Sequence, residues 1–165
     1  MVAEETGSRP ERPKAVVCKE LLGALRELVG HNPIVVTNKH SFLNLCSDAD
    51  MVTASLSGHI NEYEIKISRS DFTRDKHKRR TKIYSGEIPG LRPNRFWYVT
   101  APQIITVECL PVWAGWLEWE NGKLVERRKA PKLHPSVHEI KVLMRLAAAM
   151  RRHERLRWRQ TQIVI

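Results

Sequence analysis

A short segment, HINEYEIKIS at residues 59–68, carries side chains that could hydrolyse a phosphodiester bond. Counting every second residue from Glu62 gives Glu62, Glu64, Lys66 and Ser68, and the positions between them are apolar. Successive side chains of a strand point to opposite faces, so Glu64 and Lys66 share one face. Metal-dependent hydrolysis uses carboxylates that converge on a divalent ion, together with a lysine near the developing charge. The charged face is therefore either half of such a site or ordinary solvated surface.

A second carboxylate must come from outside this strand, and Asp50 is the candidate, at the start of an apolar segment at 50–56. A Ser-Gly turn signal joins the two segments. A three-residue loop at 56–58, with Gly58 in the left-handed conformation, sets Asp50 opposite Glu64. A loop one residue shorter turns Asp50 to the other face. The position of Gly58 favours the three-residue loop.

Each of these residues also has a simpler interpretation. A Glu-x-Lys pair on a strand is most often a solvated ion pair, and Asp50 at the start of a strand fits turn chemistry. Glu62 shares the charged face, either as a further ligand or as a peripheral residue. The order of an acid, a hairpin, Glu-x-Lys and a basic helix favours the site.

The surrounding pattern predicts one mixed α/β domain at 15–160, preceded by a disordered tail at 1–14. Helical spacing at 15–30 is followed by strand patterns, a helix capped by Ser68 or Ser70, and a hairpin around Asn121-Gly122. A capping box, Ser136-x-x-Glu139, predicts the start of a last long helix. The strands are predicted at 33–37, 50–56, 59–68 and 95–102. The expected order is αβββαβ with an added C-terminal hairpin and helix, forming a central mixed β-sheet flanked by helices.

The charge balance indicates a polyanionic partner. Net charge is +10 and the pI is about 9.9, which favours nucleic acid first and an anionic membrane surface second. Twelve of the 28 basic residues lie in two runs, at 74–82 and 145–159, although each run could equally be a solvated helix face. No apolar segment approaches the roughly 18 to 20 residues that span a bilayer, and three cysteines without a pairing framework suggest the cytoplasm.

The segment DADMVTASLSGHINEYEIKISRSDFTRDKHK, at 48–78, resembles the core of the PD-(D/E)XK nuclease superfamily. It is similar in particular to the branch of MmcB-like DNA-repair endonucleases and related phage proteins, in which E-I/V-K-x-S-x-x-D-F-x-x-D follows a strand opened by aspartate. The later strings FWYVTAP, LPVWAGWLEW and KAPKLH extend the resemblance, which covers about residues 15–135.

This resemblance implies a restriction-endonuclease-like core with a Mg²⁺ or Mn²⁺ site. Asp50 and Glu64 would be metal ligands, Lys66 the catalytic lysine, and the backbone carbonyl of Ile65 a further ligand. Asp48 competes with Asp50 for the first ligand position. The additional candidates are Glu20, Asp48, Glu62 and Asp71.

The implied activity is that of a metal-dependent endodeoxyribonuclease that leaves 3′-OH and 5′-phosphate ends, in DNA repair, recombination or phage DNA processing. Duplex or branched DNA is the expected substrate, and a second copy of the chain is a candidate partner. The expected DNA-binding residues are Arg69, Arg74, Lys76, Lys78, Arg79, Arg80 and Lys82. The alternatives are a catalytically silent DNA-binding protein with the same fold, or a phage regulatory or interaction protein. The expected location is the cytoplasm of a bacterial or phage-infected cell.

Overall fold

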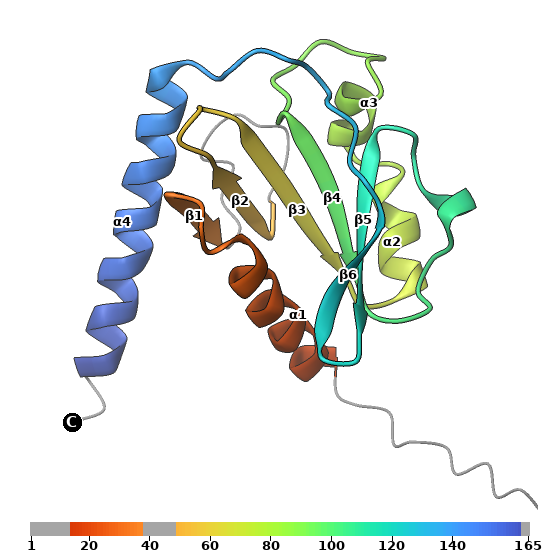
Figure 1. Cartoon of the computed structure of the whole chain (residues 1–165), viewed down its shortest axis with the longest axis horizontal. Helices are drawn as coiled ribbons and strands as arrows, with labels where there is room; N and C mark the ends of the chain where they lie inside the picture. The colour runs from red at the N-terminus through yellow and green to blue at the C-terminus, as the bar shows by residue number, and fades with distance from the viewer. Residues whose placement is uncertain (1–13, 38–48, 163–165) are drawn as a thin grey trace, which may run out of the picture.

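A computed structural model describes residues 14–37 and 49–162 of the chain (Figure 1). The helices are α1 (Lys14–Val29), α2 (Arg69–Asp75), α3 (Arg79–Tyr84) and α4 (Ile140–Gln162), with a 3-10 turn, η1, at Val107–Cys109. The strands are β1 (Ile34–Thr37), β2 (Met51–Ala54), β3 (Ile60–Lys66), β4 (Arg95–Thr100), β5 (Ala114–Glu120) and β6 (Lys123–Arg128). The predicted tail up to residue 13, and Asp48, lie outside the described residues.

All six strands form one mixed sheet whose spatial order follows the sequence, β1-β2-β3-β4-β5-β6. The pairs β1–β2, β2–β3 and β5–β6 are antiparallel, whereas β3–β4 and β4–β5 are parallel. A parallel pair needs a long crossover connection, and α2 and α3 supply it between β3 and β4. The predicted mixed α/β sheet flanked by helices is therefore confirmed.

The β2–β3 hairpin adopts the register that the three-residue loop predicts. Met51 pairs with Tyr63, and the Ser55 N–H donates to the His59 carbonyl at 2.9 Å. Gly58 has φ +80°, the left-handed conformation that glycine adopts without steric cost. Continuing this register by one residue sets Asp50, directly before β2, opposite Glu64.

The sheet separates two cores because alternate side chains point to opposite faces. On one face, α1 packs onto β3 and β4 through Leu21, Leu25, Tyr63, Ile65 and Val99. The other face carries an aromatic cluster, in which Phe72 and Tyr84 from α2 and α3 meet Phe96, Tyr98, Trp113 and Trp116. In Figure 1, α1 and the α2–α3 pair therefore lie on opposite sides of the sheet. Trp113 and Trp116 are buried core residues of this cluster, and Trp119 is partly buried against the core on the other face.

The last helix begins later than predicted. The capping box places its start at Ser136, but α4 begins at Ile140. Tertiary hydrogen bonds hold the preceding segment in an irregular conformation: Asn94 Nδ2 donates to the Ser136 carbonyl at 2.8 Å, and the His138 N–H donates to the Gly58 carbonyl at 3.1 Å. These bonds take the groups that a first helical turn would use. The helix then packs along β1, at the edge of the sheet (Figure 1).

None of the helices within the described ranges is long and apolar enough to cross a membrane.

Candidate active site

An open cavity of about 370 Å³ lies where β3 ends and β2 begins. It is lined by residues from α1, β3, α2, the α2–α3 connection, and the positions just before β2 and just after β3: Cys18, Asp50, Glu64, Ile65, Lys66, Ile67, Asp71 and Lys78. The predicted residues Asp50, Glu64 and Lys66 therefore meet at one concave surface.

Asp50 reaches this cavity from the residue before β2. Its Oδ2 accepts a hydrogen bond from the backbone N–H of Ile65 at 2.7 Å. Burial raises the pKa of Asp50, and the neighbouring charge of Glu64 raises it further, although the Ile65 N–H and the cations Lys66 and Arg80 oppose this. The negative charge of Glu64 therefore acts on Asp50, with which it lines the same cavity.

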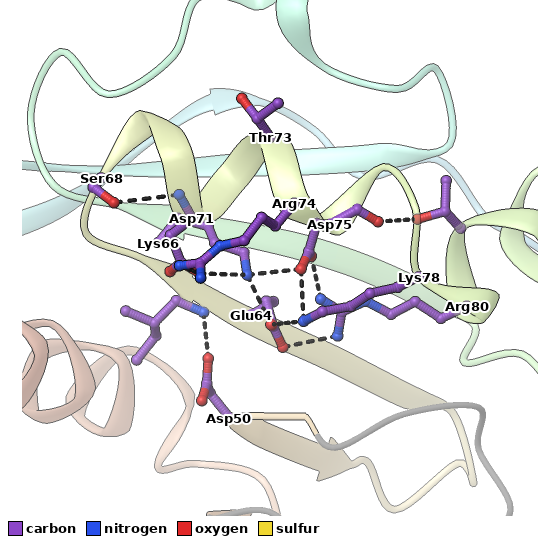
Figure 2. A network of polar contacts seen from close by, with 12 residues as sticks. Asp50, Glu64, Lys66, Ser68, Asp71, Thr73, Arg74, Asp75, Lys78 and Arg80 are labelled. Atoms are coloured by element: carbon purple, nitrogen blue, oxygen red, sulfur yellow. Dashed lines mark hydrogen bonds and ion pairs between the residues drawn. The ribbon is translucent and has the colours of Figure 1, made fainter.

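Glu64 pairs with three cations. Its Oε1 accepts from Lys66 Nζ at 2.9 Å and from Lys78 Nζ at 3.1 Å, and its Oε2 accepts from Arg80 Nη1 at 2.8 Å. Burial alone would raise the pKa of Glu64, but hydrogen bonding and charge from Arg80, Lys66 and Lys78 lower it to about 2. Figure 2 shows these three cations converging on Glu64 while Asp50 approaches from β2. Glu64 is therefore a carboxylate at neutral pH.

A second buried acid, Asp75 on α2, shares the same cations. Its Oδ1 lies 2.9 Å from Lys66 Nζ and 2.6 Å from Lys78 Nζ, and its Oδ2 pairs with Arg80 Nη2. Burial opposes the charged form, but the Arg80 charge and the lysine hydrogen bonds lower the pKa of Asp75. Lys66 is thus held between Glu64 and Asp75, with only 2% of its side chain exposed.

Arg80 turns inward because the predicted helix is broken in two. Ser68, not Ser70, caps α2 by accepting from the Asp71 N–H at 3.3 Å. Lys78, between α2 and α3, has extended backbone angles of φ −71° and ψ 145°. On one continuous helix, Asp75 and Arg80 would point about 140° apart at 100° per residue. The break lets both side chains face Glu64.

This placement corrects part of the predicted DNA-binding surface. Arg80 is wholly buried and cannot contact DNA, whereas Lys78 lines the cavity and stays partly exposed. The remaining predicted residues lie at the surface: Arg69, Arg74, Lys76, Arg79 and Lys82 are exposed. In the second basic run, the described side chains of Arg145, Arg151, Arg152 and Arg155 are exposed as well.

Glu62 lies deeper than a metal ligand would. It is 1% exposed, its Oε2 accepts from the Tyr84 hydroxyl at 2.5 Å, and Arg80 Nη1 lies 3.6 Å from its Oε1. Burial raises the pKa of Glu62 to about 7, against the lowering effect of Arg80 and Tyr84. Glu62 does not line the cavity, and its contacts are instead with the buried Tyr84 and Arg80 beneath it.

The other additional candidates differ in position. Asp71 lines the cavity, with its Oδ1 3.8 Å from Lys66 Nζ and 3.6 Å from Arg74 Nη2. Glu20, on α1, is half-buried and is not among the cavity-lining residues. The site therefore keeps Asp71 and does not include Glu20.

Asp75 and Tyr84 are site residues that the sequence analysis did not assign. Asp75 lies four residues after Asp71, one helical turn along the same face, and this spacing was the available signal. Tyr84 carries no comparable signal, because its contact with Glu62 depends on how α3 packs against β3.

The cavity offers hard oxygen donors of the kind that Mg²⁺ and Mn²⁺ prefer. Within 14–37 and 49–162, no three His, Cys, Asp or Glu side chains form a ready metal cluster. Asp50 and Glu64 supply two carboxylates. The N–H and C=O of a strand residue project to the same side, so the Ile65 carbonyl faces the side on which Asp50 binds its N–H. Two carboxylates and one carbonyl fit a divalent ion that retains several waters.

Comparison with known proteins gives information about the fold and none about the activity. No protein-family model and no curated protein matches the chain. The structure is similar to that of a protein of unknown function from Silicibacter pomeroyi, with a TM-score of 0.62 and 18% sequence identity over 93% of this chain and 94% of the other. At this identity the similarity establishes a common fold.

Proposed function

We propose that the chain is a divalent-metal-dependent endodeoxyribonuclease with a restriction-endonuclease-like core. The observation that carries the proposal is the β2–β3 register. It sets Asp50 opposite Glu64, at a cavity that both line with Lys66. Glu64 and Lys66 are both buried, so they are not the solvated surface pair that a Glu-x-Lys pattern most often represents.

The roles of the residues follow from their donors and charges. Asp50, Glu64 and the Ile65 carbonyl would hold Mg²⁺ or Mn²⁺. A bound divalent ion polarises the scissile phosphate and lowers the pKa of the attacking water. Lys66 has three N–H donors, of which two reach Glu64 Oε1 and Asp75 Oδ1. Its third N–H can donate to the attacking water or to a phosphate oxygen, stabilising the developing charge.

The basic residues that follow β3 favour a nucleic acid as the substrate. Arg69, Arg74 and Lys76 are exposed on or next to α2, which also contributes Asp71 to the cavity. Cationic side chains at this position would contact backbone phosphates irrespective of sequence. DNA repair, recombination or phage DNA processing is the proposed setting.

The test is metal-dependent cleavage of plasmid and branched DNA by the wild type, Glu64→Ala and Lys66→Ala. We expect cleavage with Mg²⁺ or Mn²⁺, none with EDTA, and loss of about 10²-fold or more in each variant. A circular dichroism spectrum and a urea melt of each variant separate lost chemistry from lost folding. Equal cleavage by wild type and variants would mean that a contaminant or another site is responsible.

A second candidate, a catalytically silent DNA-binding protein, is favoured by the ion pairing around Glu64. Three cations already satisfy both oxygens of that carboxylate, and a network of this kind can serve the fold alone. DNA binding that is independent of metal, with no cleavage of any substrate, would select this candidate over the nuclease.

A further inference from the structure

Of the three cations around Glu64, Lys78 has the most exposed side chain. The exposed fraction is 42% for Lys78, against 2% for Lys66 and 0% for Arg80. Lys78 lines the open cavity, whereas Arg80 lies beneath Glu64 and also contacts Glu62 at 3.6 Å. Lys78 is thus the most accessible of the three cations, and if it leaves, Lys66 and Arg80 remain paired with both Glu64 and Asp75.

Lys78 occupies the carboxylate oxygen that a metal ion would need. Its Nζ lies 3.1 Å from Glu64 Oε1, which it shares with Lys66 Nζ at 2.9 Å, whereas Arg80 binds the other oxygen, Oε2. The carboxylates of Asp50, Glu64 and Asp75 face the cations Lys66, Lys78 and Arg80, and Glu62 and Asp71 add further acids at the edges of this network. A divalent ion entering at Asp50 and Glu64 would meet the Lys78 charge within a few ångströms, where repulsion is strong.

We infer that Lys78 is an exchangeable counterion of the metal-free site, and that a divalent ion displaces it from Glu64 and releases its ammonium group to a substrate phosphate. This inference rests on the proposed function. Lys78 must also leave Asp75 Oδ1, which lies 2.6 Å from its Nζ, but Lys66 and Arg80 keep Asp75 paired, and the partly exposed Lys78 side chain has room to turn toward the cavity mouth. Metal binding and phosphate binding are then coupled through one lysine.

The experiment measures Mn²⁺ binding by isothermal titration calorimetry for the wild type, Lys78→Met and Lys78→Arg. Lys78→Met removes the competing charge, so we expect it to bind Mn²⁺ about tenfold more tightly. Lys78→Arg keeps the charge and should stay within about twofold of wild type. Lys132→Met, at an exposed lysine that lines a different cavity, is the matched control and should also stay within about twofold.

A second measurement follows the released ammonium group. Duplex DNA affinity is measured with EDTA and with Ca²⁺, an oxygen-preferring ion. The wild type should gain affinity on adding Ca²⁺, and Lys78→Met should gain at least about threefold less, because one phosphate contact is missing. An equal gain in both proteins would overturn the release of Lys78 to the substrate.

The outcomes separate this inference from the proposed function. If wild type binds Mn²⁺ and Glu64→Gln does not, the metal site stands. Unchanged Mn²⁺ affinity in Lys78→Met would then overturn the exchange alone. If neither wild type nor Lys78→Met binds Mn²⁺, the metal site and the exchange both fall. Mn²⁺ binding by Lys78→Met but not by wild type would support the exchange, because it would show that Lys78 alone prevents the ion from binding.

Discussion

Arg80 donates through Nη1 to Glu64 Oε2 at 2.8 Å, from a side chain that is wholly buried. The same guanidinium pairs with Asp75 and lies 3.6 Å from Glu62. One arginine therefore compensates three buried acids, and its pKa is raised by their hydrogen bonds and charges although burial opposes this. This makes Arg80 a structural requirement of the candidate site rather than a DNA-binding residue.

Replacing Arg80 by methionine should destabilise the protein by about 3–5 kcal/mol, because it leaves buried carboxylates without their partner. The free energy of unfolding is measured by urea denaturation at pH 7.5. Arg79→Met, at the exposed neighbour, is the control and should change stability by less than about 0.5 kcal/mol. Equal stability of the two variants would show that the network contributes little to folding.

Asp50→Asn should separate metal binding from folding. The amide oxygen of asparagine can still accept from the Ile65 N–H, so stability should change by less than about 1 kcal/mol. Mn²⁺ affinity should fall by about tenfold or more, because one ligand charge is lost. Calorimetry and urea denaturation test the two parts. An unchanged Mn²⁺ affinity would remove Asp50 from the ligand set and leave Asp48 as its competitor.

Gly58→Ala tests the turn that sets the hairpin register. At φ +80°, an alanine costs about 1–2 kcal/mol, and its Cβ would also lie 3.4 Å from Val137 Cβ. Gly23→Ala, in α1, is the matched control. Nothing lies within 4 Å of the added Cβ there, so it should stabilise the protein by about 0.5–1 kcal/mol. Thermal melts of both variants should therefore shift in opposite directions.

Arg74→Ala and Lys76→Ala should weaken DNA binding without altering sequence preference. If each contacts a phosphate, the slope of log affinity against log salt becomes less steep by about one in each variant. Fluorescence anisotropy on duplex DNA at several salt concentrations measures this slope. Lys132→Ala is the control, because this exposed lysine lines a different cavity, beside the β2–β3 turn. If the salt slopes of all three variants equal that of wild type, DNA does not contact Arg74 or Lys76.

His138 should make stability depend on acid. Burial, together with the neighbouring His134 and His59, lowers the pKa of His138 to about 4. The unfolded chain then binds more protons than the native one between about pH 6.5 and pH 4, so stability falls as pH decreases through this window. His138→Gln should lose less stability than wild type over the same range in urea titrations. Parallel stability curves would exclude His138 as a source of the acid sensitivity.

Local signals in the sequence were sufficient to predict the strands and turns that position the site, and to select Asp50, Glu64 and Lys66 as its candidate residues. Alternation at residues 59–68 predicted β3 because a strand repeats every two residues. Gly58 predicted the hairpin register because only glycine adopts the left-handed conformation freely. The Asn121-Gly122 hairpin is confirmed for the same reason, with φ of 48° and 86°. Each of these properties depends on steric limits within a few neighbouring residues.

Tertiary structure decided which charged residues belong to the site. One run of basic residues divides into exposed Arg74 and Lys76, inward-facing Lys78 and wholly buried Arg80. No local pattern separates them, because the division depends on the break between α2 and α3 and on acids that β3 brings beneath it. The predicted start of α4 was wrong for the same reason, since hydrogen bonds from distant residues outweighed the local capping box. The sequence by itself determined where the strands and turns form, and packing alone determined which charges are removed from water and must pair.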